Sequence, residues 1–137
     1  MSTQSTLEIN PSLKQKMRMV EDQVEDLVRK KLTAIAQTTI DLSPVDTGAY
    51  VTSHSFKTNT SSRGRGKSSS GKPSLRNNHS AQQAKKDEGF DNLMEDIAKL
   101  DLKDTKKVTI RNDSPHAQDV EYKHGYAVYT IVRNVHG

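Results

Sequence analysis

A glycine-rich stretch near the middle of the chain has a spacing that could bind phosphate. Gly66, Gly71 and Lys72 match the Gly-x4-Gly-Lys pattern of a nucleotide-binding loop. Such a loop continues with a Ser or Thr hydroxyl for Mg²⁺ and opens a helix whose amide groups face the phosphates. Pro73 stands at that position and supplies no hydroxyl. The stretch therefore does not predict a nucleotide-hydrolysing site.

The five histidines are the next candidates for chemistry, as metal ligands or as a general base beside a serine. No two of them have the His-x3-His spacing that puts both rings on one helix face, and no Gly-x-Ser-x-Gly elbow is present. The absence of cysteine also excludes thiolate ligands and a cysteine nucleophile. We expect no catalytic residue, metal or cofactor, and thus no enzyme. The histidines are His54, His79, His116, His124 and His136.

Basic side chains are concentrated in one segment. Residues 47–86 contain eight Lys and Arg and no acidic residue, whereas acidic residues outnumber basic ones elsewhere. Arg and Lys separated by Gly and Ser, without aromatic residues, suit nonspecific contact with a phosphate backbone and offer no base readout. A solvated linker that binds nothing is an equal alternative. The candidate contacts to DNA or to a partner protein are Arg63, Arg65, Lys67, Lys72 and Arg76.

The strongest structural pattern is a run of apolar residues at steps of three and four. It predicts a long helix that begins near Pro11 and ends at Ser43. About 30 helical residues span about 45 Å, which is more than a compact body of this size covers. We therefore expect part of the helix to pack on a neighbouring subunit, with a homodimeric coiled coil as the alternative. The candidate interface residues are Val20, Val24, Leu27 and Val28.

A structural turn is expected after this helix. Proline presets φ, Asp and Thr bond the backbone ahead of them, and glycine adopts positive φ freely. Alternating apolar and polar residues then predict a strand over 50–58. The turn residues are Pro44, Asp46, Thr47 and Gly48.

The remaining chain predicts a small α+β domain. Residues 59–80 contain almost no apolar side chain and predict a flexible insertion. A Ser80–Gln83 capping box then opens a second helix, and short strands are expected at 106–112 and 126–132. The prediction is one domain over 1–137, with a folded body at 11–58 and 81–134. It has a long N-terminal helix, a small antiparallel sheet with the second helix, and a long flexible basic insertion.

The composition favours an oligomer. Only 31% of residues are hydrophobic and 4% aromatic, close to the level at which chains stop burying enough apolar surface to fold. Contacts between subunits would supply the missing burial. No apolar run is long enough for a membrane helix, so we expect no membrane partner.

Two stretches resemble one known family. Residues 43–53 read Ser-Pro-Val-Asp-Thr-Gly-Ala-Tyr-Val-Thr-Ser and resemble the tPvDTGxLxxS signature of the neck or tail-completion proteins of tailed bacteriophages. Residues 112–122 read Asn-Asp-Ser-Pro-His-Ala-Gln-Asp-Val-Glu-Tyr and resemble the N-x-x-pYAxxvEyG stretch of that family. The order of the two stretches, the variable insertion between them and the long leading helix are also similar.

The resemblance implies a structural virion protein that joins head and tail. It implies a homo-oligomeric ring, with a hexamer favoured over a dodecamer, made in the host cytoplasm and placed at the head–tail junction, where DNA passes through a channel. Its implied neighbours are portal, adaptor or stopper proteins on one side and tail-terminator or tube proteins on the other, with nonspecific contact to genomic DNA. A nonspecific nucleic-acid-binding accessory protein, a helical dimer with a basic disordered arm, is the alternative.

Overall fold

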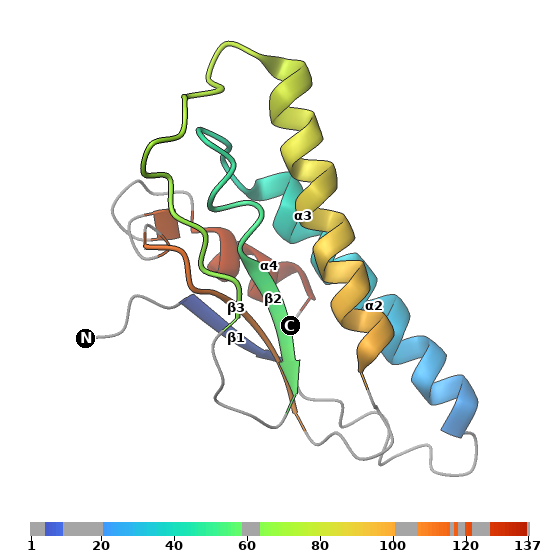
Figure 1. Ribbon diagram of the computed structural model, residues 1–137. Helices are drawn as coiled ribbons and strands as arrows, with labels where there is room; N and C mark the ends of the chain where they lie inside the picture. The colour runs from blue at the N-terminus through green and yellow to red at the C-terminus, as the bar shows by residue number, and fades with distance from the viewer. Residues whose placement is uncertain are drawn as a thin grey trace.

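The computed structural model describes residues 5–9, 21–58, 64–100, 107–115, 117, 120–121 and 127–136. These residues form an α+β fold, as the sequence predicts, in which a three-stranded antiparallel sheet of order β1-β3-β2 is covered by helices (Figure 1). The elements are β1 (Ser5–Ile9), α2 (Glu21–Leu42), β2 (His54–Thr58), α3 (His79–Lys99), β3 (Val108–Asn112) and α4 (Val128–His136).

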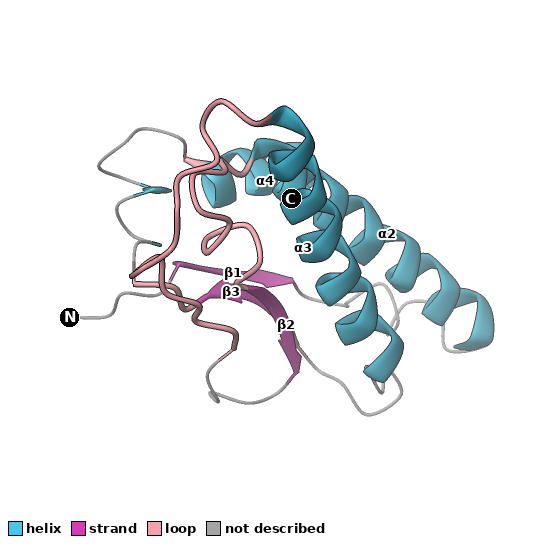
Figure 2. Cartoon of the chain, turned by 45° about the horizontal axis from the view of Figure 1, so that its top comes forward, coloured by secondary structure: helices cyan, strands magenta, loops and turns pink. Residues whose placement is uncertain are grey.

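The helices lie together beside the sheet. Figure 2 shows α2 and α3 running side by side, and α3 also packs against the edge strand β2. Helix α4 contacts both α2 and β1. The central strand β3 pairs with both neighbours, with Ile110 opposite Leu7 of β1 and Phe56 of β2. The core forms between the sheet, with Phe56 of β2 and Val108 and Ile110 of β3 buried, and the helices.

The two predicted helices form for the reasons that their sequences indicate. The apolar residues that recur along α2 at steps of three and four are buried from Val28 to Ile40. The helix ends just before Ser43–Pro44. Helix α3 begins two residues earlier than predicted, because the side chain of Asn78, and not that of Ser80, caps it by accepting from the amide of Ala81 at 3.0 Å. The predicted start of the first helix, residues 11–20, lies outside the described residues. The buried apolar residues of α2 are Val28, Leu32, Ile35, Ala36 and Ile40.

The predicted strand over 50–58 is correct only from His54 onward. Residues 49–52 form turns, and the Thr52 hydroxyl donates to the Gly48 carbonyl at 2.6 Å. The Ser53 hydroxyl donates to the Ala49 carbonyl, also at 2.6 Å. Such local bonds offer the backbone an alternative to a strand ladder. The alternation of apolar and polar side chains over 50–53 therefore does not indicate a strand.

The predicted last strand, 126–132, is wrong, since this segment contains the start of helix α4. The buried carboxylate of Glu121 accepts from the backbone amides of Tyr129 at 3.0 Å and Thr130 at 2.9 Å. The amides in the first turn of a helix have no partner within the helix, and a side chain that accepts from them stabilises the helix. Val128, Tyr129 and Val132 then form its buried face. Their β propensity favoured a strand, but the cap and the burial favour a helix.

Candidate functional site

The two stretches that carry the family resemblance meet in a buried polar cluster. Asn112, at the end of β3, donates from Nδ2 to the carbonyl of Tyr50 at 2.8 Å. The same amide group lies 3.3 Å from Nδ1 of His54, and Oδ1 accepts from the backbone amide of Ser114 at 3.0 Å. Asn112 thereby joins the turn after α2 to the segment after β3. We call the set Ser43, His54, Asn112 and Tyr129 the polar junction.

The hydrogen bonds of the junction determine the tautomer of His54. The Ser43 hydroxyl donates to the Thr39 carbonyl at 2.6 Å, so Nε2 of His54 must donate to Ser43 Oγ, 2.9 Å away. Nδ1 then accepts, and the hydroxyl of Tyr129 lies 2.9 Å from it. His54 is fully buried, and this burial lowers the pKa of its imidazole from 6.5 to about 3. The ring is therefore neutral at physiological pH.

The pairing of Ser43 with His54 resembles a nucleophile and its base, but its surroundings do not suit catalysis. Both residues are buried, so no substrate reaches the hydroxyl in this conformation. A base with such a low pKa also accepts a proton poorly near neutral pH. The junction is therefore best explained as a structural network that fixes the turn on the sheet.

A second polar group ties residues 64–65, in the middle of the basic segment, to the same region. The Asp113 carboxylate accepts from the amide of Gly64 at 2.5 Å, and the Asp113 amide donates to the Arg65 carbonyl at 3.2 Å. Arg111 forms a buried ion pair with Asp113 at 2.9 Å. The amide of Arg65 also donates to Ser55 Oγ at 2.9 Å.

Within the insertion predicted to be flexible, residues 59–80, these contacts correct the prediction for residues 64–67. Gly64 to Lys67 is bonded to β2, to the turn before it and to Asp113, and the Lys67 amide donates to Ser53 Oγ at 2.9 Å. The chain supplies hydrogen-bond partners for this segment, although the segment has no apolar residues to bury. Residues 59–63, including Arg63, lie outside the described residues.

Two of the four described basic candidates form ion pairs within the chain. The guanidinium of Arg65 forms two bonds with the Asp96 carboxylate, at 2.8 and 2.9 Å. Lys67 pairs with Glu88 of α3 at 3.2 Å. Lys72 and Arg76 are exposed. The sequence-predicted basic set is thus divided between internal ion pairs and separate surface positions.

The turn after α2 has the geometry that its residues predict. Gly48 has a φ of 91°, and a Cβ at this position would lie 2.6 Å from Cδ of Lys85. Thr47 Oγ1 accepts from the Ala49 amide at 3.3 Å. Asp46 accepts on its carboxylate from the Ser74 hydroxyl, and its carbonyl accepts from the Leu75 amide at 2.5 Å. The turn therefore also holds Ser74 and Leu75, in the loop before α3.

The predicted subunit-interface residues have different environments. Val28 is 8% exposed and belongs to the core of its own chain, which leaves it little surface for a neighbour. Leu27 is 43% exposed. Val20 and the side chain of Val24 lie outside the described part of the structure. Helix α4 adds two exposed apolar side chains, Ile131 and Val135, which are absent from the predicted interface because the sequence predicts a strand at 126–132.

Within the described ranges, no group of three or more His, Asp and Glu side chains could hold a metal ion. None of the described helices is long and apolar enough to cross a membrane. Comparison with protein-family models, curated proteins and solved structures produced no significant match.

Proposed function

We propose that this chain is a structural protein of a tailed phage, a ring-forming neck or tail-completion protein at the head-to-tail interface. The observation that supports the proposal is the bond between Asn112 and Tyr50. These residues belong to the two separate stretches that resemble the family, and they lie 62 residues apart in the chain. A resemblance by chance gives no reason for both stretches to pack into one buried cluster.

Exposed apolar residues on two helices favour assembly. Ile131 and Val135 lie one turn apart on α4 and are 37% and 63% exposed, and Leu27 of α2 is 43% exposed. Exposed apolar side chains one turn apart suit a subunit interface. A closed ring would bury such positions at each contact between subunits.

The pairing of Arg65 and Lys67 with carboxylates makes the alternative, a nonspecific nucleic-acid-binding dimer, the weaker proposal. Nonspecific binding gains free energy from every phosphate that a free cation neutralises. Ion-paired cations would first have to leave their partners. In the ring, contact with DNA would then involve the exposed Lys72 and Arg76.

The decisive test is mass spectrometry of purified tailed particles from the host that encodes this sequence. The chain is expected in intact particles at the copy number of one ring. Particles that are complete and infectious without it would overturn the functional proposal.

A variant pair tests the interface itself. Val135→Asp places a charge on the exposed apolar position of α4, and Asn134→Asp adds the same charge at the neighbouring exposed position. An unpaired carboxylate in an interface costs several kcal/mol, about 3 or more. Val135→Asp should therefore prevent ring formation, whereas Asn134→Asp should not. Native mass spectrometry in the presence of the neighbouring ring measures the assembly of each variant. Equal assembly of both variants would exclude this face of α4.

A further inference from the structure

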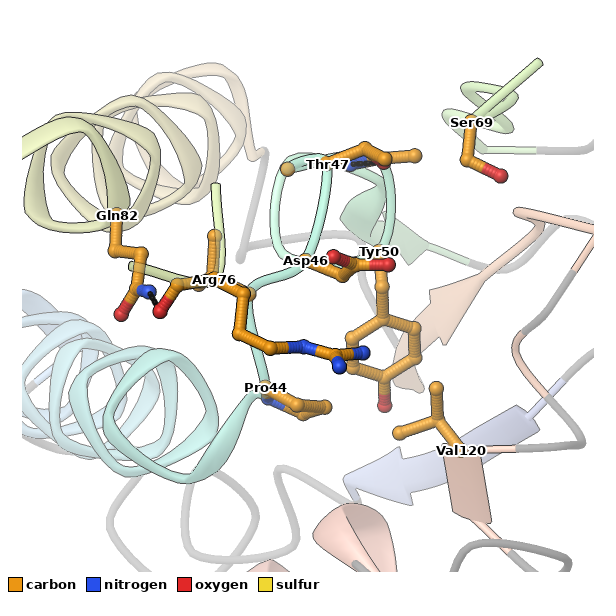
Figure 3. Close-up of a pocket in the computed structure, with 11 residues that line it drawn as sticks. Pro44, Asp46, Thr47, Tyr50, Ser69, Arg76, Gln82 and Val120 are labelled. Atoms are coloured by element: carbon orange, nitrogen blue, oxygen red, sulfur yellow. Dashed lines mark hydrogen bonds between the residues drawn. The ribbon is translucent and has the colours of Figure 1, made fainter. Parts of the chain in front are cut away.

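A cavity of about 770 Å³ lies beside the turn that follows α2 (Figure 3). Its volume lies within the range of sites that bind small ligands. Pro44, Val45 and the ring of Tyr50 provide apolar wall on the side of the turn, and Val120 lies beside the Tyr50 ring. Arg76, from the loop before α3, and Gln82 of α3 add polar groups to the lining.

Two opposite charges line this cavity without pairing. The side chain of Arg76 extends into the pocket in Figure 3, and its guanidinium has no hydrogen bond or ion pair with the described residues. Asp46 lines the same cavity, and one of its carboxylate oxygens accepts from the Ser74 hydroxyl. The other oxygen is available to a ligand.

The backbone holds Arg76 in place although its side chain is free. Its amide donates to Ser74 Oγ at 3.3 Å, and its carbonyl accepts from Nε2 of Gln82 at 2.8 Å. Asp46 is likewise tied to the loop through the bond between its carbonyl and the Leu75 amide. The cation and the anion are therefore carried by segments that are bonded to each other.

Tyr50 lines the cavity and also carries a buried hydroxyl. This hydroxyl has no hydrogen-bond partner among the residues that the structure describes. Burial raises the pKa of this phenol far above its ordinary value, and the negative charge of the nearby Glu121 raises it further. The phenol therefore remains protonated. Because the hydroxyl oxygen has almost no accessible surface, it is the ring of Tyr50, and not its hydroxyl, that meets the cavity.

We propose that this cavity binds an apolar residue that carries a free α-carboxylate: the carboxyl-terminal residue of a polypeptide or a free α-amino acid. The carboxylate pairs with Arg76, and the α-nitrogen donates to the Asp46 carboxylate. The apolar side chain packs against Pro44, Val45 and Val120. A simple anion would be repelled by Asp46 and a simple cation by Arg76, so a ligand with an acceptor and a donor on adjacent groups fits best.

Three probes test the proposal on the unmodified protein: N-acetyl-glycyl-leucine, its carboxyl-terminal amide, and free leucine. Binding is followed in ¹H–¹⁵N correlation spectra through the backbone amides of Thr47, Ala49 and Gln82. The free-acid peptide should bind with a Kd of about 1 mM or lower, and the amide about 10-fold or more weakly, since it loses the charged bond. Free leucine binding as well as the peptide would identify a free amino acid as the ligand, and weaker binding would identify a polypeptide terminus.

Arg76→Gln and Lys72→Gln form the matched variants. Each removes one positive charge from the same exposed segment, but only Arg76 lines the cavity. Arg76→Gln should weaken binding of the free-acid peptide about 10-fold, and Lys72→Gln should change it less than about 2-fold. Three results would overturn the proposal: equal binding of acid and amide, no shifts at about 10 mM of any probe, or unchanged binding to Arg76→Gln.

Discussion

Arg65 and Asp96 together bond the outer edge of strand β2. The guanidinium donates to the His54 carbonyl at 3.0 Å, and the carboxylate accepts from the Phe56 amide, also at 3.0 Å. The two side chains are joined by bonds of 2.8 and 2.9 Å, so one ion pair supplies both a donor and an acceptor to backbone groups that lack a neighbouring strand. Unpaired strand edges invite association with other chains, and this pair blocks part of the edge.

The first prediction concerns this pair. Asp96→Asn removes the charge beside Arg65 and should lower the free energy of unfolding by about 1–3 kcal/mol, measured by urea titration. Glu95→Gln is the matched control, because Glu95 pairs with Lys99 on the exposed side of the same helix. The control should be close to neutral, as for exposed pairs in general. Equal losses for both variants would contradict the role of Asp96.

The second prediction is a pH dependence from His54. Its pKa is about 3 in the folded protein against 6.5 as the ordinary value, so below about 6.5 the unfolded chain binds a proton that the folded chain does not. The free energy of unfolding should therefore fall as the pH falls from 6.5 towards 3, by about 1 kcal/mol per pH unit at the steepest.

Two variants separate this effect from other titrating groups. His54→Gln should flatten the profile over that range, whereas His79→Gln, at the exposed start of α3, should keep the wild-type slope. If His54→Gln does not fold, ¹⁵N shifts of the wild-type imidazole at about pH 5 provide the measurement. A protonated ring in the folded protein at that pH would show the prediction to be wrong.

The third prediction compares two buried tyrosines. Tyr129→Phe removes the donor to His54 Nδ1 and should lower the free energy of unfolding by about 1–3 kcal/mol. Tyr50→Phe removes a buried hydroxyl that has no partner among the described residues, so it should be neutral or stabilise by up to about 1 kcal/mol. Urea or thermal unfolding of both variants distinguishes them. A larger loss for Tyr50→Phe would mean that its hydroxyl has a partner.

The fourth prediction concerns Gly89 inside α3. Ala normally stabilises a helix interior relative to Gly by about 1 kcal/mol. Here a Cβ would collide with the Val51 carbonyl oxygen and would lie 3.0 Å from Cδ1 of Ile40. Gly89→Ala should therefore lower the free energy of unfolding by about 2 kcal/mol or more, because backbone atoms must move to make room.

Ala84→Gly, at an exposed position of the same helix, is the control and should lower the free energy of unfolding by only about 1 kcal/mol, through the lower helix propensity of Gly. A stabilised Gly89→Ala would show that the helix does not approach the turn so closely.

The local features of the fold were predictable from the sequence. The apolar spacing from Val28 to Ile40 predicts α2, and the pattern around Leu93 and Ile97 predicts α3. Gly48 has the positive φ expected of its turn. Helical periodicity and backbone preferences act over a few residues, so a single sequence carries them directly.

The tertiary structure decided the features that depend on distant partners. Helix α4 is stabilised by the Glu121 cap, and the segment from Gly64 is held by Asp113, 49 residues along the chain. Gly89 lies where α3 approaches the carbonyl of Val51. The sequence of α3 alone does not indicate which residue Gly89 approaches. Capping, ion pairing and close backbone approach depend on which residues meet in space, and no local pattern encodes those meetings. For that reason the sequence predicts a flexible insertion at 59–80, whereas Arg65 within it bonds part of the edge of β2.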